Sequence, residues 1–273
     1  MTDHLHVIGD PVSHSLSPAI HGLWIRTAGL DATYTARDVP AGTLSGALMQ
    51  LEQEGCLGAN VTLPHKEEAL KACREISHRA RQIGAVNTLI RHAEGGWYGD
   101  NTDAPGLMSA LDLAGARQIR GRTVLIIGAG GAARAAVFAL ARAGARLVLL
   151  NRTMPRAQAL SDALAEGCAE IAPLSSLRER TRHCDIVINT ASAGHHGQVF
   201  PLADGDGRLF MDISYGHAAQ AQLLAARQCG WQTQDGLAML VAQAAISFEI
   251  WFGQKPNATS ALEHLRQNVE STS

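Results

Sequence analysis

The 273-residue chain lacks the features that mark membrane and nucleic-acid-binding proteins. Aromatic residues are few, and a formal net charge of −2 gives no general attraction to nucleic acid or to an anionic membrane. The most apolar helical stretch, about 131–143, contains Arg134 and Arg142 and is too short to cross a bilayer. A strand-like run already begins at Leu5, so we expect no signal peptide. These absences predict a soluble, enzyme-like protein.

Cysteine is also sparse. The chain has five cysteines, an odd number, and their positions show no spacing typical of a metal site. Scattered thiols of this kind are typical of the reducing cytoplasm, so we expect a cytoplasmic protein without a disulfide framework or a metal site. The five positions are Cys56, Cys73, Cys168, Cys184 and Cys229.

Strand-like runs and helical patterns alternate along the chain, which predicts an α/β fold with mostly parallel sheets. In the first half we expect strands near 5–9, 33–38, 57–62 and 85–91, and helices near 18–28, 42–54 and 65–73. A second series has strands near 123–127, 146–150, 185–190 and 208–213, and helices near 131–143, 154–166 and 218–228. The helices after Asp235 have no strand partner, and we expect them to return to the first half. Two α/β domains flanking a cleft are therefore predicted, with cofactor and substrate in the cleft.

A glycine-rich turn follows the apolar run 123–127 and precedes an Ala-rich helical pattern. Strand, glycine turn and helix in this order form a pocket for a dinucleotide pyrophosphate. Gly128 permits the tight turn, Gly130 lets the backbone approach the phosphate, and Ala133 keeps the helix close to its strand. The whole turn reads Gly128-Ala129-Gly130-Gly131-Ala132-Ala133.

The second strand of this series ends in Asn151-Arg152-Thr153 rather than in an acid. A carboxylate there would repel the 2′-phosphate of NADP, whereas a guanidinium attracts it. Arg152 and Arg156 are either surface arginines or ligands of that phosphate. Because a helix start disfavours cations, an anionic ligand explains them better. The pattern favours NADP over NAD.

Residues 9–18 form a polar loop that leads into a helix. In the structural interpretation, Ser17 caps the helix and Pro18 takes its first position. In the functional one, Ser15 and Ser17 bind a carboxylate at the helix N-terminus. The loop alone does not decide between the two.

Lys66 and Asp103 are the best candidates for proton transfer. Lys66 lies in a predicted first helical turn, where a cation opposes the helix dipole. It is either an exposed lysine paired with Glu67 and Glu68 or a partly buried lysine kept for chemistry. Asp103 either caps the helix that begins near Ala104 or is the second proton-handling group.

Taken together, these motifs resemble the shikimate dehydrogenase family (shikimate/quinate dehydrogenases) over nearly the full chain. Such enzymes interconvert 3-dehydroshikimate and shikimate with NADP(H), in the pathway to aromatic amino acids. The resemblance rests on Gly9–Pro18, Asn60–Lys66, Ala85–Thr88, Asn101–Asp103, the turn at 128–133, Asn151–Thr153 and Asp235–Ala245.

The resemblance implies a role for individual residues. Lys66 would transfer the proton with Asp103 as its partner, and Ser15 and Ser17 would hold the substrate carboxylate. Other substrate contacts would be Thr62, Asn87, Asp103, Tyr215 and Gln243. Cofactor contacts would be Gly128, Ala129, Gly130, Gly131, Ala132, Asn151, Arg152, Thr153, Arg156, Ile213, Gly236 and Met239. Residues 1–103 and 238–273 would form the substrate-binding domain, and 104–237 the Rossmann-type NADP-binding domain. We expect a monomer or a homodimer.

Several positions depart from the family's usual pattern, namely Gly22, Ala104, Thr190, Ala191, His217 and Gln220. None of them removes a proposed catalytic group. They leave open a paralogue with weak shikimate activity that acts on quinate or a related hydroxy acid, possibly with NAD. A non-catalytic ligand-binding protein is a third hypothesis, and the intact Lys66 and Asp103 argue against it.

Overall fold

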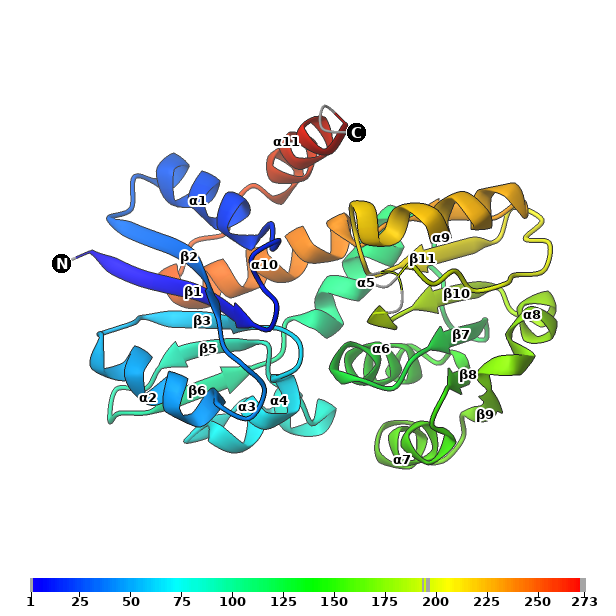
Figure 1. The fold of residues 1–273 in the computed structure, drawn as a ribbon, viewed down its shortest axis with the longest axis horizontal. Coiled ribbons are helices and arrows are strands. Elements are labelled where there is room, and N and C mark those ends of the chain that lie inside the picture. Colours follow the sequence, from blue (N-terminus) through cyan, green and yellow to red (C-terminus); the bar gives the residue numbers. More distant parts are fainter. Residues whose placement is uncertain (1, 193, 195–196, 271–273) are drawn as a thin grey trace. The chain divides into compact units, whose positions relative to one another are not determined.

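The computed structural model describes residues 2–192, 194 and 197–270. The chain divides into two compact units, and both are α/β (Figure 1). The first unit contains Met1–Gly106 and Leu240–Ser273, and the second contains Leu107–Met239. These limits fall inside helices α5 (Asp103–Leu113) and α10 (Leu237–Phe252), whereas the boundaries predicted from the sequence fall at the starts of the same helices.

The first unit contains a mixed six-stranded sheet in the order β2-β1-β3-β5-β6-β4. Pairs β1–β2, β1–β3 and β4–β6 are parallel, and pairs β3–β5 and β5–β6 are antiparallel. Gly95 and Gly96 have φ angles of 86° and 75°, so they form the tight turn that joins β5 to β6 as a hairpin. The strands are β1 (Asp3–Gly9), β2 (Ala32–Asp38), β3 (Gly58–Val61), β4 (Glu75–Ile76), β5 (Thr88–Arg91) and β6 (Trp97–Asp100).

Helices cover both faces of this sheet (Figure 1). On one face, apolar side chains of α2 (Leu44–Gln53), α3 (Lys66–Ala72) and α4 (His78–Ile83) pack with the strands. On the other face, α1 (Ser17–Ala28) and α10 bring their aromatic rings to the sheet, and Trp251 Nε1 donates to the Leu89 carbonyl at 2.9 Å. The last helix, α11 (Ala258–Glu270), follows Asn257, whose carbonyl accepts a hydrogen bond from Trp24 of α1.

His21 lies in this aromatic layer and is fully buried. Its ring stacks on Tyr34 with 4.2 Å between ring centroids, and Trp24, Phe248 and Trp251 surround it. Burial lowers the pKa of His21 to about 3. His21 is therefore a neutral ring at physiological pH.

The second unit has a six-stranded sheet whose strands are all parallel, in the order β12-β11-β10-β7-β8-β9. The strand order reverses between β7 and β10, which is the doubly wound arrangement of dinucleotide-binding folds. The strands are β7 (Thr123–Ile127), β8 (Arg146–Asn151), β9 (Glu170–Pro173), β10 (Ile186–Asn189), β11 (Leu209–Asp212) and β12 (Gln232–Gln234).

The helices of the second unit lie on both faces of its sheet. α6 (Gly131–Arg142) and α7 (Met154–Leu164) pack against β7, β8 and β9. α8 (Leu177–Arg180) and α9 (His217–Gln228) pack on the face that carries Leu125, Val148 and Phe210. The α/β class predicted from the sequence is confirmed. Among the described residues, no helix combines the length and the apolar character needed to cross a bilayer.

Candidate active site

A buried ion pair stands at the centre of the polar cluster in the first unit. Lys66 is the first residue of α3, and its Nζ lies 2.6 Å from Asp103 Oδ2. The Lys66 and Asp103 side chains are only 14% and 5% exposed. The interpretation of Lys66 as an exposed surface lysine is therefore wrong. Removing both charges from water is costly, so this pair needs further hydrogen bonds to remain in place.

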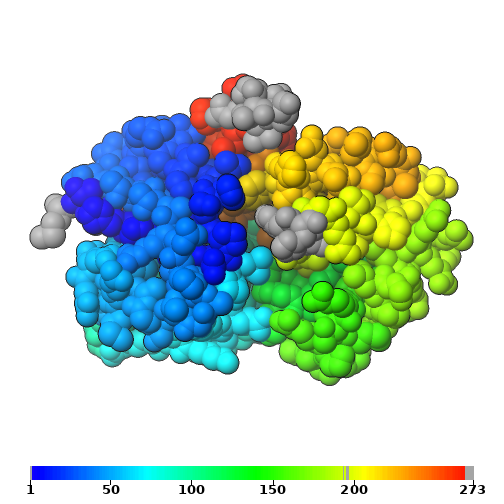
Figure 2. All heavy atoms as spheres, viewed as in Figure 1, coloured from blue at the N-terminus to red at the C-terminus, as the bar shows by residue number. Residues whose placement is uncertain are grey.

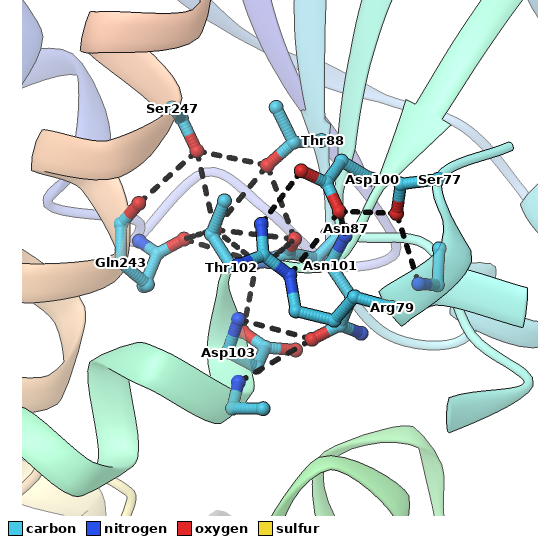
Figure 3. Close-up of polar contacts among 12 residues, drawn as sticks. Ser77, Arg79, Asn87, Thr88, Asp100, Asn101, Thr102, Asp103, Gln243 and Ser247 are labelled. Carbon is cyan, nitrogen blue, oxygen red and sulfur yellow. Dashed lines mark hydrogen bonds and ion pairs between the residues drawn. The ribbon is translucent and has the colours of Figure 1, made fainter. Parts of the chain in front are cut away.

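Asn87 supplies such a bond to Asp103. Its amide Nδ2 lies 2.9 Å from Asp103 Oδ1 and 3.1 Å from Gln243 Oε1 (Figure 3). The Asn87 oxygen accepts from the backbone N–H of Thr102 at 2.7 Å. The structure thus brings together Lys66, Asn87, Asp103 and Gln243, four residues predicted from the sequence.

Asn101 rather than Asp103 caps helix α5. Asn101 Oδ1 accepts from the backbone N–H groups of Asp103 and Ala104 at 3.1 and 3.4 Å. The hypothesis that Asp103 is merely a helix cap is therefore wrong. The reason is that Asn101 satisfies the free N–H groups of the first turn, which leaves the Asp103 carboxylate for Lys66 and Asn87.

The two predicted carboxylate ligands lie beside the start of α1. Ser15 Oγ accepts from the backbone N–H of Ser17 at 3.2 Å, and Ser17 is the first helical residue. Leu16 occupies the N-cap position without a side-chain cap bond, so the prediction that Ser17 caps the helix is wrong. Ser17 is buried at this position. The loop that carries Ser15 lies at the surface of its unit (dark blue in Figure 2).

Thr62 lies at the end of the neighbouring strand, directly before the turn that leads to Lys66. Its backbone N–H donates to the Ile8 carbonyl at 2.9 Å, and Asp10 N–H donates to the Leu63 carbonyl at 2.9 Å. A side chain at Gly9 would overlap the Thr62 methyl group, so only glycine permits this approach. The loops that follow β1 and β3 are therefore held side by side.

A second polar layer lies behind these residues. Asn60 Nδ2 is 3.0 Å from Ser247 Oγ, and Ser247 Oγ is 2.8 Å from Thr88 Oγ1. Tyr34 donates to Asn60 Oδ1 at 2.7 Å, and burial raises the pKa of Tyr34 well above its usual range, so its hydroxyl stays a donor. Sequence reasoning missed Tyr34 and Ser247. Ser247 follows Gln243 by one helical turn, and that spacing was the available signal.

In the second unit, the glycine turn lies between β7 and α6, where it was predicted. Gly128 has a φ of +112°, and a Cβ there would lie 2.6 Å from Thr190 Oγ1. At Gly130, the N-cap of α6, a Cβ would meet no atom within 4 Å. No acidic side chain lies in the first turn of α6. The backbone N–H groups of Gly131 and Ala132 belong to this first turn, where a helix provides no intrahelical acceptor for them.

The remaining predicted cofactor residues of the β8–α7 connection lie at the surface of the unit. Asn151 ends β8, and its Nδ2 donates to the Thr153 carbonyl at 2.9 Å. Arg152 and Thr153 follow and are exposed, and Arg156 is exposed in the first turn of α7. Arg152 and Arg156 thus follow the end of β8, and their contact with the cofactor stays a prediction.

Ile213 and Tyr215 follow β11 at the same edge of the parallel sheet. Gly236 N–H donates to the Ser214 carbonyl at 2.9 Å, and a side chain at Gly236 would overlap the Ile213 carbonyl. Glycine is therefore needed where segments 213–215 and 236 meet. Met239 is buried in the first turn of α10.

Comparison with known proteins identifies the family. The model for the shikimate dehydrogenase substrate binding domain matches residues 7–89, and the model for shikimate / quinate 5-dehydrogenase matches 110–214. The model for the shikimate 5′-dehydrogenase C-terminal domain matches 236–266. These matches, with the doubly wound sheet and the glycine turn, define a two-unit protein of the dinucleotide-binding class.

Individual relatives agree with this class. The chain is 50% identical to shikimate dehydrogenase (NADP(+)) from Hyphomonas neptunium, with 100% of both chains covered. It is similar to the structure of shikimate dehydrogenase from Aquifex aeolicus, with a TM-score of 0.87, 32% identity and 97% and 98% of the two chains covered. The Thermus thermophilus shikimate 5-dehydrogenase in complex with NADP(H) and shikimate has a TM-score of 0.82 and 35% identity, with 97% and 99% covered. The chain belongs to the shikimate dehydrogenase family.

Proposed function

We propose that this protein is an NADP-dependent shikimate dehydrogenase that interconverts 3-dehydroshikimate and shikimate in aromatic amino-acid biosynthesis. The observation that carries the proposal is the buried Lys66–Asp103 pair, 2.6 Å apart and held by Asn87, in a chain of this family. Oxidation of a secondary alcohol releases a hydride and a proton. The Lys66–Asp103 pair can take up or release this proton.

Lys66 is the residue that moves the proton. In the direction of oxidation, the neutral amine form of Lys66 takes the proton of the reacting hydroxyl and becomes an ammonium, while the hydride leaves the carbon for the oxidised cofactor and the carbon becomes a carbonyl. In the direction of reduction, the Lys66 ammonium gives a proton to the carbonyl oxygen. Asp103 accepts a hydrogen bond from Lys66 in its charged form and so holds Nζ in one place. NADP, when bound, supplies or accepts the hydride.

The residues of the second unit fit NADP. The open space at Gly130 and the first-turn N–H groups of α6 would accept the pyrophosphate. Arg152 and Arg156 would pair with the 2′-phosphate, since a guanidinium binds phosphate with charge-assisted hydrogen bonds. The turn residues Gly128, Ala129, Gly131 and Ala132 and the strand-end residues Asn151 and Thr153 would line the same ligand. Ile213, Gly236 and Met239 would contact the nicotinamide.

Substrate recognition uses hydroxyl and amide groups. Ser15 and Ser17 would bind the shikimate carboxylate, because their hydroxyls lie at the start of α1, where a negative charge is favoured. Thr62, Asn87 and Gln243, with Asp103, would bind the ring hydroxyls, and Tyr215 would add a further contact. Residues 1–103 and 238–273 would thus form the substrate domain, and 104–237 the cofactor domain.

A second candidate is a family member that prefers quinate or a related hydroxy acid, possibly with NAD. The family model that matches residues 110–214 covers both shikimate and quinate dehydrogenases, which favours keeping this candidate. Departures at Gly22, Ala104, Thr190, Ala191, His217 and Gln220 bear on turnover, cofactor preference or domain movement rather than on the ion pair.

We also propose that the protein works in the cytoplasm as a monomer or a homodimer, on a small-molecule substrate alone. All five cysteines are described and carry free thiols, as a reducing compartment allows.

The test is shikimate-dependent formation of NADPH by the purified chain at alkaline pH. We expect turnover with shikimate and NADP. Binding of both ligands without turnover would instead support the ligand-binding hypothesis. Absence of both binding and turnover would reject the proposed function.

A further inference from the structure

A partly buried ion pair outside the proposed catalytic residues contacts the turn that leads to Asp103. Asp100 ends β6, and its carboxylate forms an ion pair with Arg79 of α4. Arg79 Nη2 lies 2.6 Å from Asp100 Oδ2, and Arg79 Nε lies 3.3 Å from Oδ1 (Figure 3). Ser77, the N-cap of α4, donates to Asp100 Oδ1 at 2.5 Å. The Asp100 side chain is only 13% exposed, so a two-pronged contact of this kind fixes its position.

The Asp100 carboxylate in turn holds the backbone of the next residue, Asn101. Asp100 Oδ1 accepts from the backbone N–H of Asn101 at 2.7 Å. The Asn101 side chain is fully buried, its Nδ2 donates to the Ala85 carbonyl, and its Oδ1 caps the N–H groups of Asp103 and Ala104. Two hydrogen bonds therefore connect the Asp100 carboxylate to the main chain of Asp103.

The same strand end also fixes Asn87. The Asn87 backbone N–H donates to the Asp100 carbonyl at 3.0 Å, and the Asn87 side chain donates to Asp103 Oδ1. Asp103 is thus held at its main chain through Asn101 and at its side chain through Asn87. Both routes begin at Asp100.

We infer that Arg79 and Asp100 are positioning residues that orient the Asp103 carboxylate toward Lys66. The inference rests on the proposed function, since the position of Asp103 matters to the rate only if Lys66 transfers the proton. A displacement of about 1 Å at a reacting group lowers turnover by up to about a hundredfold. Neither Arg79 nor Asp100 is proposed to touch the substrate or NADP.

Four variants test the inference. Arg79→Gln removes the charge of the pair, Asp100→Asn keeps the shape of Asp100 and removes its charge, and Arg79→Lys restores a cation. Arg74→Gln is the matched control, because Arg74 forms a 2.6 Å ion pair with Glu94 in the same unit, and that pair is exposed. Each variant is assayed for turnover, for the KM of shikimate and NADP, for shikimate binding without cofactor and for thermal unfolding.

We expect Arg79→Gln and Asp100→Asn to lower kcat by about tenfold, with less than about threefold change in shikimate binding and in both KM values. Arg79→Lys, which restores the charge but not the two-pronged contact, should give a kcat between those of Arg79→Gln and wild type. Arg74→Gln should keep kcat within about twofold of wild type, because exposed ion pairs contribute little.

The inference is overturned if folded Arg79→Gln and Asp100→Asn keep wild-type kcat. It is also overturned if neither variant folds, since the pair would then serve stability alone. If only one of them folds, its kcat decides. A failure of the proposed function looks different, because the wild-type protein would then show no shikimate-dependent turnover at all.

Discussion

The two units each place a strand–turn–helix junction at the carboxyl end of a parallel strand, and the two junctions are opposite in character. Between β3 and α3, the turn ends in Lys66, whose side chain is largely buried and paired. Between β7 and α6, the turn consists of Gly and Ala, and the position that a Cβ would take at Gly130 is empty. The β3–α3 junction thus carries a charged side chain, whereas the β7–α6 junction consists of backbone and small residues.

The two junctions differ in the groups that surround the partial positive charge at the helix N-terminus. A helix N-terminus carries partial positive charge and favours an anion. In α3 the first turn carries the acidic residues Glu67 and Glu68, and Asp103 pairs with the Lys66 cation. In α6 the first turn has no acidic side chain, and in the proposed function its N–H groups would bind the phosphates of the cofactor. In that proposal, the same local fold would provide chemistry in one unit and cofactor binding in the other.

Replacement of Lys66 should have the largest effect. Lys66→Ala removes the group that moves the proton, so we expect kcat to fall by about a thousandfold. Affinity for shikimate should change much less. Steady-state kinetics with thermal unfolding measured in parallel checks this, and a variant that keeps its turnover would remove Lys66 from the mechanism.

Filling the empty space of the second junction should affect NADP alone. The Cβ of Gly130→Val would meet no atom within 4 Å, so we expect folding to be retained, and the side chain would occupy the proposed phosphate site. We expect the KM for NADP to rise by about a hundredfold, as for the loss of one or two hydrogen bonds to a charged group.

Gly128→Ala is the contrasting variant. Its φ of +112° and the 2.6 Å approach to Thr190 predict a loss of folding stability of about 1–3 kcal/mol. Unchanged NADP kinetics in Gly130→Val would show that this turn does not bind the pyrophosphate.

Arg152 should set the preference between the cofactors. Arg152→Gln removes a charge-assisted contact to the 2′-phosphate, so kcat/KM for NADP should fall by about tenfold or more while that for NAD changes little. Arg146→Gln, at the other end of β8, changes the same charge far from the turn and serves as the control. Equal losses with both cofactors would contradict this role.

The smallest effect concerns the interior behind the first junction. Burial lowers the folded-state pKa of His21 to about 3 from 6.5, so the unfolded chain binds the extra proton first as the pH falls. Stability is therefore present above pH 6.5 and is lost below it, by about 1 kcal/mol between pH 7 and pH 5.5. Denaturant unfolding of wild type and His21→Phe checks this. An unchanged pH slope in the variant would exclude His21 as its source.

The longer helices and strands were predictable because apolar periodicity and glycine turns are local properties of the sequence, whereas the short elements β4, α4, β9, α8 and β12 were not predicted. Cap assignments failed because a polar side chain two residues earlier takes the backbone donor in each case: Ser15 Oγ accepts from the Ser17 N–H, and Asn101 Oδ1 accepts from the Asp103 N–H. Local physics named Lys66 and Asp103 as candidates but did not show that they touch, since 37 residues separate them. That pairing came from the family resemblance.

The Arg79–Asp100 pair was not predicted at all. Neither helix α4, which carries Arg79, nor strand β4 was expected from the sequence. The parallel pairing of β4 with β6 places the start of α4 beside Asp100. The contacts that orient a catalytic side chain are tertiary contacts, and a local sequence pattern does not predict them.

The most direct test of the account is to measure kcat/KM for shikimate and for quinate, each with NADP and with NAD. Arg152, which follows β8, and the Lys66–Asp103 pair predict that kcat/KM is highest for shikimate with NADP. A higher value for quinate, or for NAD with either substrate, would contradict the account.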